Sequence, residues 1–297
     1  MGAPLTGFEE FMAAGPAGPA WDHVDFIDAR HSGATPSLNI NGWMDVGAYE
    51  TVKLLEFQQH HDDQYLIMAP TEHCKMTLTA PDAKLGDRPI GDSTFPYEEV
   101  VTSWFHRWLR DDPDAWEPMP KVAVYLMGAG IWLRGERWPL PEVTDDRLYL
   151  ASDESANTLW GDGRLEAAAP AKAGADHFVA DPDGTAYNLA DSRLRLRYHD
   201  GMTAPSDLVP GHVYRIEVRG ITTANYFPAG HRIRIELAGS NFPLADRNWN
   251  ADGVNELATD GPIAHVTVHH GAEHPSCLRF HRYTGVVEPK PLAPVPA

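Results

Sequence analysis

The sequence predicts an α/β region followed by a β-sandwich, and two observations support this prediction. Short apolar segments at residues 36–42 and 63–70 flank a segment whose apolar residues have helical spacing. A strand, a helix and a strand of this length form a βαβ unit, which implies a parallel sheet. Beyond residue 118, many short runs alternate apolar and polar residues between Gly and Pro turns, as in a jelly roll.

Two helices are expected in the α/β region. The first lies within residues 48–61 and places Val52 and Leu55 on one stripe. The second lies between residue 95 and the Asp-Pro pair at 112–113, where a helix must stop. Its apolar residues repeat at helical spacing: Val100, Val101, Trp104, Phe105, Trp108 and Leu109. This spacing favours a place in the core for the two tryptophans.

The second region contains eight runs that we expect to be strands: residues 121–128, 146–152, 176–181, 192–200, 212–220, 231–239, 264–270 and 276–280. The clearest is 231–239, where charged residues alternate with three apolar ones, Ile233, Ile235 and Leu237. The expected division of the chain is an α/β domain, a jelly-roll β-sandwich and a Pro-rich tail: residues 1–117, 118–285 and 286–297.

Composition excludes several classes of function. The net charge is −18, from 42 acidic and 24 basic residues, which argues against nucleic acid and anionic membrane surfaces as partners. No run of about 18 apolar residues predicts a membrane span. The first residues lack the basic start of a signal peptide, so a cytoplasmic location is expected. The two cysteines exclude a disulfide framework, and no motif requires a cofactor.

Two consecutive strand ends carry an acid and a histidine. Asp45 is the last residue of the motif GWMD at the end of the first predicted strand, and His73 is the last residue of APTEH after the second. Functional groups gather at the carboxyl ends of parallel strands, so both side chains should share one rim. A carboxylate there can accept the Nδ1 proton of a histidine and stabilise the imidazolium. The alternative is that Asp45 caps the following helix and His73 is an ordinary loop residue.

Nine stretches of the sequence carry a family likeness. They include GWMD at 42–45, APTEH at 69–73, FHRWLR at 105–110, KVAVYLMGAGIW at 121–132 and PAGHRIRIELAGSNFPLADRN at 228–248. In content and order they resemble the hydrolase family of cocaine esterase, α-amino-acid ester hydrolases, glutaryl acylases and Xaa-Pro dipeptidyl-peptidases. The resemblance implies the C-terminal part of an α/β-hydrolase sheet followed by a jelly roll. It also implies that Asp45 is the triad acid and His73 the triad base.

The sequence lacks the nucleophile that this resemblance implies, a serine in a G-x-S-x-G turn upstream of the acid. Ser93 in GDSTF follows the histidine and has no closing glycine, and Ser240 in AGSNF lies in the β region. We therefore expect little or no esterase or peptidase activity from the isolated chain. The alternative is a non-catalytic β-sandwich or binding module that retains Asp45 and His73 as relics.

The resemblance implies a small ester, amide or peptide as the substrate. The chain corresponds to the back part of a hydrolase, so the expected partners are a separate N-terminal hydrolase fragment or a second copy of the chain. Near residues 181–187 two segments follow each other directly that are separated by additional strands in relatives. This suggests an internal deletion. A sandwich with fewer strands would expose its edges.

Three other features are weaker indications. Cys74 adjoins His73, and a buried thiol is expected there rather than an activated nucleophile. The histidine pairs at 60–61 and 269–270 lack the spacing of a zinc site, and no metal is expected. The segment RNWNADGVNE at 247–256 resembles a calcium-binding loop. Its first ligand position holds Asn where such a loop has Asp, which favours a loop shaped by Asx turns.

Overall fold

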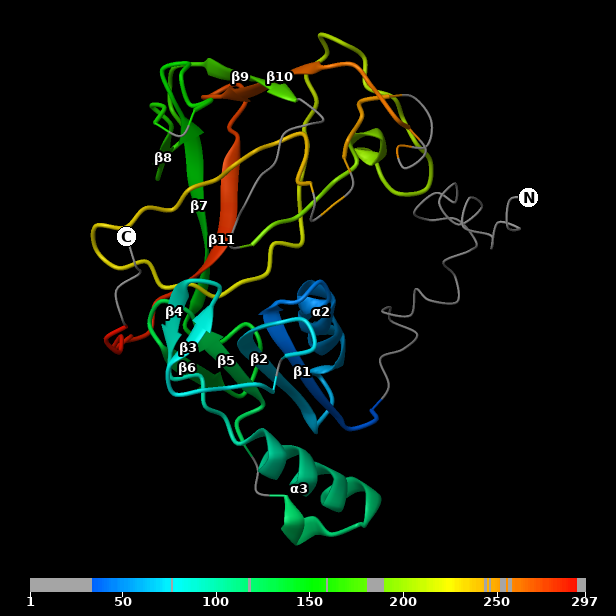
Figure 1. Cartoon of the computed structure of the whole chain (residues 1–297), viewed down its shortest axis with the longest axis vertical. Helices are drawn as coiled ribbons and strands as arrows, with labels where there is room; N and C mark the ends of the chain where they lie inside the picture. Colours follow the sequence, from blue (N-terminus) through cyan, green and yellow to red (C-terminus); the bar gives the residue numbers. More distant parts are fainter. Residues whose placement is uncertain are drawn as a thin grey trace, which may run out of the picture. The chain divides into compact units, whose positions relative to one another are not determined.

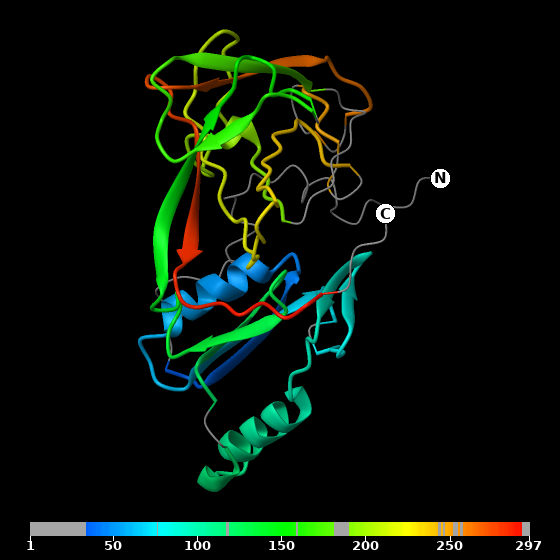
Figure 2. The same ribbon diagram turned by 90° about the vertical axis from the view of Figure 1, so that its left-hand side faces the viewer.

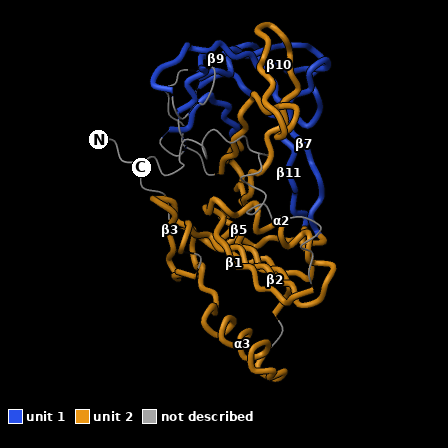
Figure 3. Tube along the Cα trace, turned by 90° about the vertical axis from the view of Figure 1, so that its right-hand side faces the viewer, with its two compact units in different colours: residues 1–13, 142–188, 234–284 blue, residues 14–141, 189–233, 285–297 orange. Residues whose placement is uncertain are grey.

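The described part of the chain forms two compact units (Figure 3). The first unit described here (orange in Figure 3) contains the described residues of 34–141, 190–233 and 285–292. The second (blue) contains those of 142–180 and 234–284. Each unit is therefore assembled from segments that are separate in the sequence. The computed structural model describes residues 34–75, 77–116, 119–158, 160–180, 190–242, 245, 247–251, 255 and 258–292.

The first unit is built on a four-stranded sheet with the order β1-β2-β5-β6 (Figure 1). Its strands are β1 (Ser37–Met44), β2 (Gln64–Glu72), β5 (Val122–Leu126) and β6 (Ile131–Gly135). β1, β2 and β5 run parallel, and β6 is antiparallel to β5. The helix α2 (Ala48–Gln58) connects β1 to β2, so the predicted βαβ unit is confirmed. β5 and β6 extend this sheet, although the expected division at residue 117 assigns them to the β region.

The sheet lies between two helices, α2 on one side and α3 (Tyr97–Leu109) on the other (Figure 2). β2 is buried on both faces, as its unbroken apolar run requires in a parallel sheet. α2 contributes a stripe of buried residues: Ala48, Val52 and Leu55. The predicted stripe of the first helix is therefore confirmed.

Trp104 anchors α3 to the sheet. Its ring centroid lies 5.4 Å from that of Tyr65 in β2 and 5.2 Å from that of Trp116, in edge-to-face arrangements that favour aromatic packing. Phe105 and Leu109 stay 51% and 77% exposed, so the apolar stripe of this helix is only partly buried. The helix is followed by the 3₁₀ turn η3 (Pro113–Ala115), which begins at the predicted stop, and β3 (Ala83–Leu85) pairs with β4 (Arg88–Gly91) in a hairpin.

The second unit consists of antiparallel strands. β7 lies between β11 and β8, and β9 pairs with β10. The bounds are β7 (Val143–Ala151), β8 (Arg164–Glu166), β9 (Gly174–Ala180), β10 (Ala264–His270) and β11 (Cys277–Tyr283). These confirm the strands expected at 146–152, 176–181, 264–270 and 276–280. The described residues thus form a sheet-rich structure with few helices.

The strand prediction is wrong for three of the eight runs. Residues 192–200 contain only the 3₁₀ turn η4 (Leu196–Tyr198), and residues 212–220 and 231–239 form no strand. Alternation of apolar residues predicts an extended chain, but a strand also needs a neighbour that accepts and donates hydrogen bonds, which a local pattern does not specify. Several apolar side chains of these runs stay exposed, among them Val213, Val218 and Leu237. The predicted join at residues 181–187 lies outside the described residues.

Neither α2 nor α3 comes near the length of a membrane-spanning helix, and the described residues contain no other helix that could cross a bilayer.

Candidate active site

Asp45 and His73 meet at the carboxyl ends of two neighbouring parallel strands. The Nδ1 atom of His73 lies 2.6 Å from Oδ2 of Asp45. Asp45 is the first residue after β1 and His73 the first after β2, and parallel pairing brings both strand ends to one edge. The side chain of Asp45 is 5% exposed and that of His73 is 66% exposed. The structure thus brings the two predicted residues together, while their catalytic role stays a prediction.

A close approach of the two strands sets this geometry. A Cβ atom at Gly42 would lie 2.3 Å from the carbonyl oxygen of Thr71, so only glycine fits at that position of β1. The next residue, Trp43, is 3% exposed, and its Nε1 donates to the carbonyl of Tyr125 in β5 at 2.8 Å. In the text GWMD, the glycine therefore permits the approach and the tryptophan fixes the strand end from which Asp45 projects.

Each carboxylate oxygen of Asp45 has its own partner. Oδ1 accepts a hydrogen bond from the amide of Gly47 at 2.7 Å, and Oδ2 faces His73. Burial raises the pKa of Asp45, but hydrogen bonds from Gly47, His73 and Asn41, together with the charge of His73, lower it below the usual 3.8. Asp45 is therefore ionised at neutral pH. The alternative that Asp45 caps the helix is not supported, because the N-cap residue of α2 is Gly47 and this helix has no side-chain cap hydrogen bond.

The tautomer of the His73 ring follows from this charge. An ionised carboxylate can only accept hydrogen bonds, so Nδ1 of His73 carries a proton and donates it to Asp45. The neutral ring then keeps its lone pair on Nε2. Within the part of the chain that the structure describes, Asp45 is the only hydrogen-bond partner of this ring. Nε2 is therefore free to take up a proton, as a general base must.

Asn41 and Thr51 support this Asp45–His73 dyad and were not singled out by the sequence patterns. Asn41, in β1, is 8% exposed, and its Nδ2 donates to Oγ1 of Thr51 in α2 at 2.8 Å. Thr51 in turn donates from Oγ1 to the carbonyl of Gly47 at 2.8 Å. The clue in the sequence is a polar residue at an inward position of an otherwise buried strand, where its amide must find partners.

The two serines considered from the sequence do not join the dyad. Ser93 is fully buried, and its Oγ accepts from the amide of Ala80 at 3.1 Å and donates to the carbonyl of the same residue at 3.3 Å. The Oγ atom of Ser240 is buried and has no hydrogen-bond partner in the described structure. The buried Ser93 hydroxyl, which is bonded to the main chain of Ala80, is not placed as a nucleophile for His73.

Cys74 requires a correction, because its thiol is exposed and not buried as expected. The residue lies in the turn after β2 with a left-handed φ of 59°, and this turn leads the chain away from the buried strand into solvent. Among the residues that the structure describes, no group of three or more His, Cys, Asp or Glu side chains is arranged to hold a metal ion.

The segment 247–256, which resembles a calcium-binding loop, contains the expected Asx turn. Oδ1 of Asn248 accepts from the amide of Asn250 at 3.2 Å. The side-chain amide of Asn250 donates to the carbonyls of Ala180 and Pro262 at 3.1 and 3.0 Å, so this residue links separate segments of the second unit. Asp252 and Gly253 of the same text lie outside the described residues.

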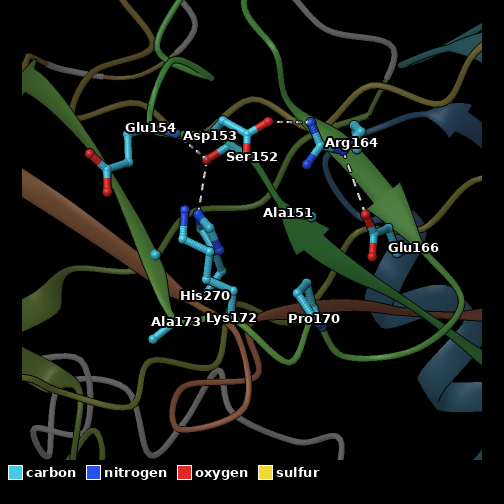
Figure 4. Close-up of a pocket in the computed structure, with 11 residues that line it drawn as sticks. Ala151, Ser152, Asp153, Glu154, Arg164, Glu166, Pro170, Lys172, Ala173 and His270 are labelled. Atoms are coloured by element: carbon cyan, nitrogen blue, oxygen red, sulfur yellow. Dashed lines mark hydrogen bonds and ion pairs between the residues drawn. The ribbon is translucent and has the colours of Figure 1, made fainter.

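A second cluster of serine, histidine and aspartate lies in the second unit. Its Ser152 and His270 line a cavity of about 80 Å³ (Figure 4), and Asp176 completes it. Ser152, after β7, donates from Oγ to Oδ2 of Asp176 in β9 at 2.6 Å. Nε2 of His270, at the end of β10, lies 2.9 Å from the same Oγ. The Glu154 amide also donates to Ser152 Oγ at 3.1 Å.

This second cluster does not have the geometry of a catalytic triad. In a triad the histidine stands between the serine and the acid, with the acid on Nδ1. Here Ser152 bonds both other residues, Oδ2 of Asp176 lies 3.5 Å from Nε2 of His270, and Nδ1 of His270 is buried with no partner in the described structure. Because Ser152 gives its proton to Asp176, Nε2 of His270 must donate to Ser152 and cannot act on it as a base. The cluster is a polar link between three strands.

Residues 177–279 match the family model of the X-Pro dipeptidyl-peptidase C-terminal non-catalytic domain. Cocaine esterase from Rhodococcus sp. (strain MB1 Bresler) is 25% identical over 336 aligned positions, which cover 86% of this chain and 58% of the esterase. The resemblance to this hydrolase family is confirmed. Because the alignment is longer than the chain of 297 residues, the esterase has inserted segments within the matched region.

Two solved structures of other proteins share this fold. An aminopeptidase from the marine sediment archaeon Thaumarchaeota archaeon matches with a TM-score of 0.74 at 20% identity, over 94% of this chain and 60% of that one. A CocE/NonD family hydrolase from Staphylococcus aureus matches with a TM-score of 0.56 at 13% identity, over 83% of this chain and 54% of that one. The chain therefore spans less than two thirds of the length of each of these relatives.

Proposed function

We propose that this chain supplies the acid and the base of a serine hydrolase that cleaves ester or amide bonds. Asp45 orients His73, and His73 is the general base. The observation that carries the proposal is the 2.6 Å contact between the buried, ionised carboxylate and Nδ1 of an exposed imidazole whose Nε2 is free. The identity of the relatives supports the same chemistry, since they include an esterase and an aminopeptidase.

The dyad would act on a serine that lies outside the described residues. Nε2 of His73 removes the hydroxyl proton while the serine oxygen forms a bond to the substrate carbonyl carbon, whose π electrons move to the oxygen. The Asp45 carboxylate stabilises the imidazolium that results. When the intermediate collapses, the bond to the leaving group breaks and His73 returns the proton to it. Water then repeats the sequence on the acyl-serine, with His73 again as the base.

The β region has a different part in this proposal. Residues 177–279 match a domain described as non-catalytic, and we propose that they form a jelly roll that supports the hydrolase fold or binds a partner. The exposed apolar side chains of the three unpaired runs favour an assembly in which further strands cover them. A purely non-catalytic role for the whole chain is the alternative, and the same domain description favours it.

Complementation tests the catalytic proposal. The chain is mixed with a separately produced N-terminal fragment of cocaine esterase that contains the G-x-S-x-G serine, and hydrolysis of 4-nitrophenyl acetate is followed. We expect activity from the mixture and none from either polypeptide alone. His73→Ala should lower the rate of the mixture by about a thousand-fold, because the serine loses its base. The matched control is His60→Ala, which removes an exposed histidine at another position and should change nothing.

A fluorophosphonate probe provides the second test. The isolated chain should not be labelled, because the proposal places the nucleophile elsewhere. Stoichiometric labelling of the isolated chain would show that it contains an activated serine of its own. An active mixture whose rate changes only a few-fold in His73→Ala would remove His73 from the mechanism.

A further inference from the structure

We propose that Asn41 is a positioning residue of the dyad, which holds the Asp45 carboxylate at the angle that His73 requires and stabilises its negative charge. This inference rests on the proposed function. It assigns a role to a residue that neither the sequence patterns nor the comparisons identify. Asn41 lies four residues before Asp45, at an inward position near the end of β1.

The hydrogen bonds of Asn41 form part of a closed network. Its Oδ1 accepts from the amide of Gly42 at 2.7 Å, and its Nδ2 donates to Oγ1 of Thr51 at 2.8 Å. Thr51 donates to the carbonyl of Gly47 at 2.8 Å, and the amide of Gly47 donates to Oδ1 of Asp45 at 2.7 Å. The network therefore runs from β1 through α2 and returns to the acid of the dyad.

Asn41 and Asp45 converge on the same small space. A Cβ atom at Gly47 would lie 3.3 Å from Oδ1 of Asp45 and 3.6 Å from Nδ2 of Asn41, so both polar groups border the empty side of this glycine. A hydrogen bond from the Asn41 side chain also contributes to the low pKa of Asp45. An amide is suited to this position, because it can donate to the carboxylate without adding a charge that competes with His73.

The electrostatic surroundings of Asp45 are simple, which makes the effect of Asn41 measurable. His73 is the titratable group that contributes to the lowered pKa of Asp45, through its hydrogen bond and its charge. The nearby ions Glu72 and Lys75 pair with each other at 2.6 Å, and both are more than half exposed. A change at Asn41 should therefore reach the dyad through the carboxylate alone.

The test is an NMR titration of the His73 ring in the intact chain. The Cε1–H resonance of His73 should show an acidic inflection where Asp45 becomes protonated, below pH 3.8. Asn41→Leu keeps the size of the side chain but removes its donor, so that inflection should move up by about one pH unit. Asn41→Asp keeps the acceptor for Gly42 and adds a second carboxylate, so the inflection should move up further.

Asn39→Leu is the matched control. Asn39 faces the same side of β1, but its Nδ2 donates to Oγ of Ser37 and to the carbonyl of Tyr65, at 3.0 and 3.1 Å, away from the dyad. This variant should leave the inflection in place, even if it lowers stability by a similar amount. A purely structural role for Asn41 would give equal results for the two asparagines.

The outcomes separate this inference from the proposed function. If the parent shows no acidic inflection at His73, the dyad itself is wrong and the proposed function fails with it. If the parent shows the inflection and neither Asn41→Leu nor Asn41→Asp moves it, the dyad stands and the role of Asn41 is refuted. Movement in both variants and not in Asn39→Leu establishes the positioning role. Should Asn41→Leu fail to fold, Asn41→Ala, which also removes the amide donor without adding a charge, takes its place in the titration.

Discussion

Gly42 of β1 lies against the main-chain carbonyl of Thr71 in β2, with room for a hydrogen atom and none for a methyl group. This one approach determines how far apart the two strand ends lie, and therefore whether the side chains that follow them can meet. The obstacle at Gly42 is main chain on the partner strand, so a larger residue cannot be accommodated by a change of rotamer.

Gly42→Ala should accordingly separate the two strand ends. The added Cβ would lie 2.3 Å from the Thr71 carbonyl oxygen, and we expect a loss of about 1–3 kcal/mol of unfolding free energy in urea. The acidic inflection of His73 should disappear as well. Gly47→Ala is the control: its nearest neighbour is a side-chain oxygen of Asp45 at 3.3 Å, which can shift. Equal stability of both variants would contradict this account of the strand ends.

The dyad should also make stability depend on pH in the acid range. The pKa of Asp45 is below 3.8 in the folded chain, so the folded state favours the ionised carboxylate. The stabilisation that the ionised Asp45 gives to the folded state is fully present at pH values above its pKa in the unfolded chain, about 3.9. This stabilisation is lost as the pH falls through the lower pKa of Asp45 in the folded chain. The stability difference between the parent and Asp45→Asn should therefore shrink between pH 5 and pH 2, measured by urea unfolding.

An exposed carboxylate provides the comparison for that measurement. Asp87→Asn should show a small difference from the parent at every pH, because Asp87 is solvent-exposed. A difference between the parent and Asp45→Asn that stays constant down to pH 2 would mean that Asp45 gains nothing from its partners in the folded state.

Two buried tyrosines should respond in opposite ways to loss of the hydroxyl. Tyr97 is 6% exposed, its hydroxyl has no partner in the described structure, and burial raises its pKa. Tyr125 is fully buried and donates to the carbonyl of Ile90 at 2.5 Å. Tyr97→Phe should leave stability unchanged or raise it by up to about 1 kcal/mol, whereas Tyr125→Phe should lower it by about 1–2 kcal/mol. Thermal unfolding of the two variants, side by side, checks the sign.

The Ser152 cluster should behave as a structural link. Ser152→Ala leaves Asp176 without its hydroxyl donor and His270 without its acceptor, so we expect a loss of about 1–3 kcal/mol in urea unfolding. Esterase activity of the complemented mixture should not change. Ser155→Ala, at an exposed position of the same loop, is the control. Loss of activity in Ser152→Ala with stability intact would assign this serine to catalysis.

The sequence predicted the dyad because the relevant pattern is local. Asp45 and His73 follow consecutive strands of one βαβ unit, and the geometry of such a unit is fixed by the parallel pairing of its strands. The helix from Tyr97 to Leu109 was predictable for the same reason, since its apolar spacing and its stop at the Asp-Pro pair lie within one short segment.

What escaped prediction depends on partners that are distant in the sequence. Ser152 and His270 are 118 residues apart, and no spacing rule connects them. The runs at 212–220 and 231–239 have the right alternation, but a strand exists only where another strand pairs with it. The local pattern around Asn41 does not identify its partner Thr51. Thr51, which in turn donates to the carbonyl of Gly47, reaches Asn41 only when α2 lies over β1.

Asp45 and His73 are 28 positions apart in the sequence, and the segment between them contains only the crossover helix α2, the strand β2 and their short connections. Folding therefore has a short loop to close before acid and base meet, at a modest entropic cost and with little dependence on the rest of the polypeptide. The acid and the histidine therefore come together within one short segment, and this pair is a compact structural module.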